Sequence, residues 1–421
     1  KMRKTKNIYI LLFSVISISL FAQQNSTNSP YTRFGYGKLV DAGFARTSSM
    51  GGIGIGFRKN NTINVVNPAS YSSIDSTSFI FEFGFSGLLS KFSTASGGSA
   101  LKTSGNIDYF GMQFPVTKWL GMSVGIVPYS FIGYNFNSKD STLIPSSKVY
   151  SINYQSFSGS GGISQAYLGV SVDIMKRLSL GINGYYMFGN IIHSRMSEQT
   201  FSDKRSSYST YSESALRVNS FNARLGLQYH QPLNDTRDML TVGAIYEMQH
   251  KLNSQYTVQT LGIDTVRDTL INVFQLPATY GFGATYSLDN RFLFGADVQY
   301  QQFSKVLFQN KNDLLNDRIS FSAGVEFTNR AKSNSYIDRM SWRLGANYST
   351  SYVKVNNNSL SEYALSLGVG FPFRTNKSMI NVLLQYGGFG TKQNNMIKED
   401  YLKIGINFTL NDNWFYKIRL H

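Results

Sequence analysis

Alternation of apolar and small or polar side chains, repeated along most of the chain, is the feature that most constrains the fold. It begins in TSFIFEFGFSG (77–87), where every second residue from Phe79 to Phe85 is aromatic and the residues between include Glu82 and Gly84. Successive side chains of a strand point to opposite faces. Each such segment is therefore predicted to be a strand with one apolar face and one small or polar face. Counted between connections, the segments number fourteen.

Two folds place such strands in register: a soluble sandwich and a membrane barrel. Sandwich strands are ordinarily about 5–6 residues long. Many of these segments last about ten residues or more, the length that a tilted membrane-crossing strand needs. Charged residues such as Asp173, Arg224 and Glu326 fall almost wholly on the small or polar side. We therefore predict an all-β fold, a 14-stranded antiparallel transmembrane β-barrel over residues 77–411, followed by a tail at 412–421.

The predicted connections alternate in length. The short ones include 115–118 and 175–177, whereas the long Ser- and Asn-rich ones include 137–160, 196–214 and 253–273. Outer-membrane barrels show this asymmetry, with short turns on the periplasmic side and longer loops outside the cell. We expect the long stretches to be loops.

The stretch before the first strand needs a container. Residues 46–73, RTSSMGGIGIGFRKNNTINVVNPASYSS, mix Gly, Ser and Asn with apolar side chains and follow neither a helical nor a strand period. The backbone groups of such a segment need hydrogen-bond partners. We assign 23–76 to an N-terminal extension and a plug (hatch) inside the lumen. The predicted plug residues are Met50, Gly51, Gly52, Gly54, Gly56, Asn67, Pro68 and Ala69.

The first 22 residues have the pattern of a secretory signal peptide. Four positive charges in Lys1–Lys6 precede an apolar run from Ile8 to Phe21, and Ala22 precedes a polar start. The run is shorter than the ~20 residues of a membrane-spanning helix. The chain has no Cys, which excludes disulfides, thiol catalysis and a lipidated cysteine. We predict export to the outer membrane of a diderm bacterium.

The net charge of +16 falls to +12 without the four positive charges of the predicted signal peptide (16 − 4). No nucleic-acid-binding motif accompanies this charge, so we expect contact with outer-membrane lipid and lipopolysaccharide instead. The four His residues (His193, His230, His250 and His421) have no metal-ligand spacing, and GGIGIG lacks the spacing of a phosphate-binding loop. We expect no enzyme activity, no metal and no cofactor.

Four stretches resemble one known family. SPYTRFGYG (29–37), RTSSMGGIGIG (46–56), NPAS (67–70) and FQLPATYGFGATYSLDNRFLFGADVQY (274–300) are similar to the long-chain fatty acid transporter family (FadL-like, OmpP1-like), in a form typical of the Bacteroidota. The resemblance covers nearly the whole mature chain. It implies a monomeric, plugged barrel that passes hydrophobic molecules inward, with a kinked third strand that leaves a lateral gap. The chain departs from that family in an added polar and aromatic stretch before the Gly-rich hatch and in its Ser-rich loops.

The predicted third strand reads GIVPYSFIG (125–133), with Pro128 at its middle. Proline has no N–H to donate and belongs at an edge, a bulge or a break of a sheet. We therefore predict a lateral gate at Pro128, Tyr129, Phe131 and Gly133. A plain bulge near the outer rim is the alternative.

Two hypotheses of function follow. In the first, the barrel passes hydrophobic small molecules across the outer membrane along a path lined by Tyr109, Tyr129 and Tyr185, with a lateral opening at the third strand. In the second, it is a non-transporting structural or accessory subunit of a larger outer-membrane assembly or secretion complex. The polar loops, the mature charge and the basic, aromatic tail at 414–417 motivate the second. The partner is a hydrophobic ligand in the first and other outer-membrane proteins in the second.

Overall fold

The computed structural model describes residues 26–40, 43–144, 149–203, 207–233, 238–262, 265–329, 333–355, 358–373 and 377–413. The predicted signal peptide lies outside these residues, as does the predicted tail from Trp414 onward.

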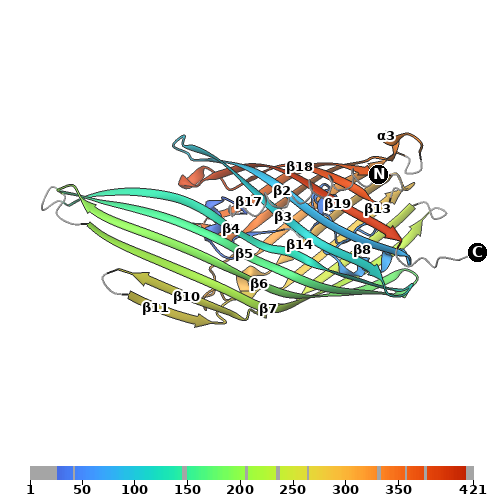
Figure 1. Ribbon diagram of the computed structural model, residues 1–421, viewed down its shortest axis with the longest axis horizontal. Helices are drawn as coiled ribbons and strands as arrows, with labels where there is room; N and C mark the ends of the chain where they lie inside the picture. Colours follow the sequence, from blue (N-terminus) through green and yellow to red (C-terminus); the bar gives the residue numbers. More distant parts are fainter. Residues whose placement is uncertain are drawn as a thin grey trace, which may run out of the picture.

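Within the described residues, fourteen antiparallel strands close into a barrel, which confirms the predicted fold class (Figure 1). Each strand pairs with its neighbour along the chain, and the last strand pairs with the first to close the wall. The strands are β2 (Ser78–Ser93), β3 (Ser99–Pro115), β4 (Leu120–Ile144), β5 (Val149–Met175), β6 (Leu178–Phe201), β7 (Ser207–Leu233), β8 (Asp238–Glu247), β13 (Thr279–Leu288), β14 (Phe292–Gln301), β15 (Arg318–Thr328), β16 (Ser341–Val355), β17 (Asn358–Pro372), β18 (Met379–Phe389) and β19 (Lys398–Asn413).

Two rows of aromatic side chains on the outer face mark where the wall meets the bilayer surfaces. In one row, Tyr246 pairs with Tyr280 and Tyr280 pairs with Tyr300. In the other, Phe292 pairs with Phe327, the partner of Trp342. On β14 the two rows are eight residues apart, about 27 Å at ~3.4 Å per residue, and strand tilt brings this toward the ~25 Å apolar band of outer-membrane barrels. The Phe- and Leu-rich face therefore contacts lipid.

One side of the barrel stands far above the rest of its rim. Strands β4 to β7 are 24–27 residues long, against 10–11 for β8, β13, β14 and β15. The hairpin of β10 (Ser254–Leu261) and β11 (Thr265–Ile271) pairs with the upper part of β7. Together they make a six-stranded extension, seen at the left of Figure 1. The extension lies opposite the short turns and therefore on the extracellular side.

The extension corrects the prediction that the stretches 137–160, 196–214 and 253–273 are loops. Their described residues are mostly strand. The polar composition of these stretches predicts loops. However, Thr and Tyr, which favour strands, alternate with Ser in them, and the hairpins continue beyond the membrane. The alternation that places apolar side chains on the outer face ends at the bilayer surface, whereas the pairing of the strands continues past it.

The remaining elements are short. They are β1 (Lys38–Leu39), β9 (His250–Lys251), β12 (Gln275–Leu276), η1 (Pro30–Arg33), α2 (Ala45–Ser48), η2 (Pro68–Ser73), η3 (Phe303–Lys305), α3 (Tyr336–Arg339) and η4 (Gln393–Asn395). Among the described residues, no helix combines the length and apolar character that crossing a membrane requires. Residues 26–76, here called the N-terminal segment, contact inward-facing side chains of the wall.

Replacing a lipid-facing aromatic residue with arginine should destabilise the barrel. Phe282 is central on β13 and 63% exposed, and arginine at the bilayer midplane costs about 2–4 kcal/mol. Phe282→Arg should therefore lower the urea midpoint for folding into liposomes, followed by heat-modifiable mobility on gels. Tyr154→Arg, on the outward face of β5 in the extension, is the control and should fold as the parent does. Equal folding of both variants would contradict the assigned membrane level.

Candidate functional site

The wall is discontinuous between β3 and β4. Their pairing begins at Pro115 with Gly121 and ends at Phe110 with Ile126. Above that point β3 continues to pair with β2, and β4 continues to pair with β5. On the extracellular side of Ile126, the facing edges of β3 and β4 do not pair with one another in the described chain. We call this stretch the seam.

The N-terminal segment occupies the seam. Strand β1 pairs with β4, with Lys38 opposite Phe131 and Leu39 opposite Ser130, and the N–H of Val40 donates to the carbonyl of Tyr129 at 3.0 Å. On the other side, the amide of Asn28 donates to the carbonyl of Thr103 at 3.1 Å, and that of Asn106 donates to the carbonyl of Ser26 at 2.9 Å. The segment thereby satisfies backbone groups on both edges of the seam.

All four predicted gate residues lie on this edge of β4. Pro128 stands at a register shift against β5, where it pairs with Ser164, while Ser130 pairs with Ile163. Tyr129 and Phe131 contact β1 through the backbone bonds described above. Gly133 exchanges two hydrogen bonds of 3.2 Å with the hydroxyl of Thr32. The proline therefore sits where the regular ladder ends, and the N-terminal segment replaces the missing strand.

The Gly-rich part of the N-terminal segment packs its backbone against glycines of the wall. A Cβ at Gly345 would lie 2.0 Å from the backbone nitrogen of Gly51, and one at Gly324 would lie 2.3 Å from the carbonyl oxygen of Met50. A Cβ at Gly243 would lie 2.0 Å from the carbonyl oxygen of Ile55. These approaches leave no room for a side chain, which explains why the inward face of the strands is rich in glycine.

The Asn-Pro-Ala turn contacts a second arc of the wall. Asn67 donates to the carbonyls of Ile55 at 2.7 Å and Leu227 at 3.1 Å. A Cβ at Gly181 would lie 2.4 Å from the backbone of Pro68. The carbonyl of Ala69 accepts a 2.9 Å hydrogen bond from Ser171. The predicted plug residues thus meet strands from several sides of the barrel.

Wall carboxylates bind the segment from different strands. Asp297 accepts from the N–H groups of Gly54 at 2.6 Å and Ile55 at 2.7 Å. Asp173 accepts from the hydroxyl of Ser72 at 2.6 Å and pairs with Arg58 at 3.2 Å. Thr285 donates at 2.8 Å to the carbonyl of Gly56. The bonds to Asp297 and Asp173 are charge-assisted, and such bonds are roughly twice as strong as neutral ones. The segment is therefore fixed to the wall at separate points.

A buried triad joins the segment to β15 and β16. Glu326 lies between two guanidinium groups, with Arg46 of the segment at 2.6 Å and Arg343 at 2.7 Å. Arg343 continues to Asn381 at 2.7 Å. A second ion pair joins the wall residues Arg224 and Glu247, and Arg224 also donates to the carbonyl of Val66 at 3.2 Å.

Burial shifts titrating groups of the segment. It lowers the pKa of Arg58, and the neighbouring Asp173 carboxylate opposes that shift. Burial also raises the pKa of Tyr36 well above its ordinary value, and the Tyr36 hydroxyl donates to the carbonyl of Gln275 at 2.7 Å. The phenol therefore acts as a neutral hydrogen-bond donor.

Little free volume remains between the segment and the wall. Cavities there measure about 130 and 80 Å³, below the roughly 300–1,000 Å³ usual for ligand pockets. Tyr109, expected to line a ligand path, is covered by Phe44, whose ring stacks on it at 3.6 Å. Among the described residues, no group of three or more acidic or His side chains could hold a metal ion.

The sequence reasoning missed the role of residues 26–40. They fall within the predicted extension and plug at 23–76, and 29–37 carry part of the family resemblance, but they follow no period that would predict contact with a strand. Thr32 and Lys38 nevertheless lie against β4. The one usable signal was Pro128, which marked the edge that needs them.

The sequence model of one family, described as BamG, matches residues 4–421. The chain belongs to the BamG family. No curated protein matches its sequence. The family label differs from that of the fatty acid transporters, although the resemblance to the latter reappears in the fold.

Solved structures similar to this BamG-family chain include two hydrocarbon channels and a FadL homologue. The CymD monoaromatic hydrocarbon channel has a TM-score of 0.59 and 14% identity, over 91% of this chain and all of its own. The Pseudomonas putida toluene transporter TodX has a TM-score of 0.58 and 14% identity, over 88% of this chain and 98% of its own. A Pseudomonas aeruginosa FadL homologue has a TM-score of 0.58 and 13% identity, over 89% of this chain and 98% of its own. At such identity the likeness establishes the fold, which points to the outer membrane.

Removing the acid of the triad should destabilise the barrel strongly. Glu326→Gln leaves Arg46 and Arg343 buried without a counter-charge, and breaking a buried pair costs about 3–5 kcal/mol. Arg46→Met should cost less, because Glu326 keeps Arg343. The measurement is the urea midpoint of the folded protein in detergent.

The control for this comparison is Arg291→Gln. Its ion pair with Asp289 spans 3.4 Å and is about half exposed, so the change should cost about 0–1 kcal/mol. A Glu326→Gln protein no less stable than Arg291→Gln would contradict the role given to the triad.

Proposed function

We propose that this BamG-family protein is a non-transporting accessory barrel of a larger outer-membrane protein complex, with its bore closed by the N-terminal segment acting as a plug. The exposed apolar row on the extension, outside the bilayer, carries the proposal. The closed lumen and the family label, distinct from that of the hydrocarbon channels, support it.

The lumen contacts argue against an easily displaced plug. Opening would break the Glu326 triad, the Asp297 and Asp173 contacts and the glycine packing together. Breaking one buried ion pair alone costs about 3–5 kcal/mol, which is more than a typical allosteric coupling energy of about 1–3 kcal/mol. A ligand would need to overcome several such contacts. A barrel that is built to stay shut fits the requirement of an accessory subunit.

The extension offers a surface for a protein partner. Met196 and Leu261 both pair with Tyr211, so the three form one cross-strand row, exposed by 49%, 39% and 37%. Tyr211 lies on the outward face of β7, fourteen residues beyond Leu225, the partner of the girdle residue Tyr246. That is about 35 Å above the girdle at ~3.4 Å per residue and ~40° tilt. Exposed apolar rows outside lipid commonly mark protein contacts.

The seam favours a second candidate function. Similar structures bear the names of hydrocarbon channels, and the β3–β4 wall is closed above Ile126 by the N-terminal segment instead of a strand. Displacement of residues 38–40 would open a lateral path for a hydrophobic small molecule. This candidate needs the segment to move, whereas the first needs it to stay.

Photo-crosslinking tests the accessory role. p-Benzoylphenylalanine placed at Tyr211 in the native outer membrane should give an adduct of one discrete size with another protein, because the apolar row would face a partner. The same probe at Phe282, which faces lipid, is the control and should give none. Identification is by mass spectrometry after affinity purification. A Tyr211 probe that yields only the uncrosslinked chain would sink the proposal.

A disulfide across the seam separates the two candidates. The chain has no Cys, and Leu39 and Ser130 are cross-strand partners at a separation that a disulfide can bridge. Oxidised Leu39→Cys/Ser130→Cys protein should keep the Tyr211 adduct and leave uptake of toluene and oleate unchanged, with Leu39→Cys alone as control. Loss of uptake that a reductant restores would favour the transport candidate.

A further inference from the structure

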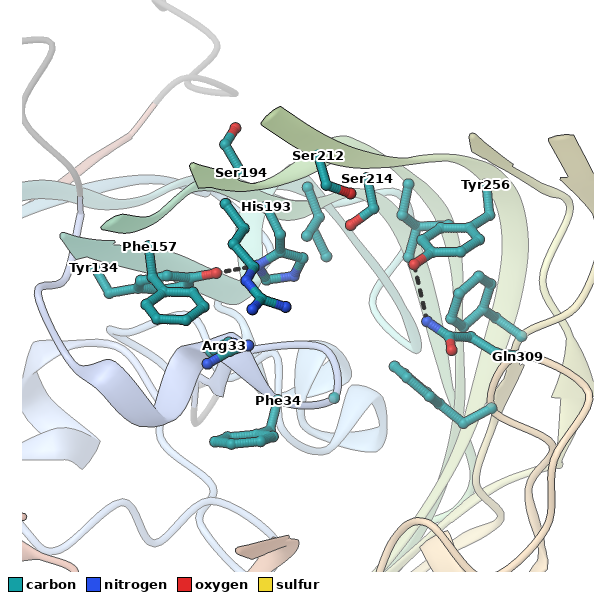
Figure 2. A pocket seen from close by; sticks show the side chains of 16 residues that line it. Arg33, Phe34, Tyr134, Phe157, His193, Ser194, Ser212, Ser214, Tyr256 and Gln309 are labelled. Carbon is teal, nitrogen blue, oxygen red and sulfur yellow. Dashed lines mark hydrogen bonds between the residues drawn. The ribbon is translucent and has the colours of Figure 1, made fainter. Parts of the chain in front are cut away.

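We propose that the cavity at the base of the extension binds an anionic sugar. It measures about 380 Å³, within the range of ligand pockets. Its lining comes from segments far apart in the sequence (Figure 2). They include Arg33 of η1, Tyr134 of β4, Phe157 of β5, Arg195 of β6 and Tyr256 of β10. The inference does not depend on whether the barrel transports or assembles.

Two arginines give the cavity its preference for an anion. The guanidinium carbon of Arg33 lies 4.2 Å from the ring centre of Phe157, and that of Arg195 lies 5.6 Å from the same ring. All sixteen lining residues are described, and none is acidic. Neither arginine forms an ion pair with any residue in the described ranges. Like charges held close repel, and a carboxylate or phosphate matches the guanidinium fork.

The rest of the lining suits a polyhydroxylated body. Figure 2 shows Ser212 and Ser214 of β7 above Arg33, with Tyr134 and His193 hydrogen-bonded at one side and Tyr256 and Gln309 at the other. These bonds measure 2.8 and 3.1 Å. The hydroxyl and amide groups can exchange hydrogen bonds with sugar hydroxyls.

The aromatic part of the lining distinguishes a sugar from simpler anions. The rings of Tyr256 and Phe308, which line the cavity and are half-buried, have faces of partial negative charge, which suit the C–H faces of a pyranose. An alkyl chain would cover the nearby polar groups without offering them hydrogen bonds. Inorganic phosphate would leave the rings uncovered. A uronate or a sugar phosphate satisfies both parts of the lining.

Calorimetric titration of the full chain in detergent tests the assignment. Glucuronate should bind about ten-fold more tightly than glucose, the factor expected for a charge-assisted contact. Arg33→Gln/Arg195→Gln should lose about that factor for glucuronate, and both side chains are exposed enough for the variant to fold. Arg267→Gln, exposed on β11 and outside the cavity lining, is the matched control and should bind as the parent does.

Three results would overturn the proposal: glucose as tight as glucuronate, hexanoate as tight as glucuronate, or inorganic phosphate as tight as glucose 6-phosphate. A free sugar and the end of a surface glycan share this chemistry. Tighter binding of trigalacturonate than of galacturonate would support the assignment with a glycan as source, and equal binding would support it with a free sugar.

Discussion

The unpaired edge of β4 above Ile126 is the constraint on which the rest of the structure depends. In hydrocarbon, every backbone N–H and C=O must find a partner within the protein, because no water is there to supply one. Pairing between β3 and β4 stops at this point, and Pro128 marks it. The edge receives its partners from β1, the shortest kind of strand, which pairs at two residues. A wall that ends early thus requires the chain before it to return and complete it.

That requirement explains the composition of the inward face. To reach β4 from the turn side, the N-terminal segment has to cross the lumen, and its own backbone needs room and partners there. Gly243, Gly324 and Gly345 provide room through the absence of a Cβ, while Asp297 provides an acceptor for two consecutive N–H groups. The small and acidic residues opposite the lipid face follow from contact with a second polypeptide backbone, not from exposure to water.

Much of the fold could be predicted from the sequence, because lipid imposes a period of two on the outer face. The fourteen strands and the placement of charged residues such as Glu326 on the inner face follow from that period. The extension could not be predicted, since above the bilayer the lipid no longer selects apolar residues and pairing leaves no comparable pattern. The contacts of Asn28 and Thr32 with the seam join residues far apart in the sequence, and polar side chains of this type suit many surroundings.

The free volume of this barrel is distributed differently from that of a simple pore. A pore needs continuous free volume along its axis. The cavities beside the N-terminal segment have room for only a few water molecules each. The larger cavity lies above, where Arg33 of the segment meets Phe157 of the extension. The N-terminal segment therefore contributes Arg33, Phe34 and Gly35 to the lining of the outer cavity. A ligand in this cavity would thus contact both the extension and the N-terminal segment.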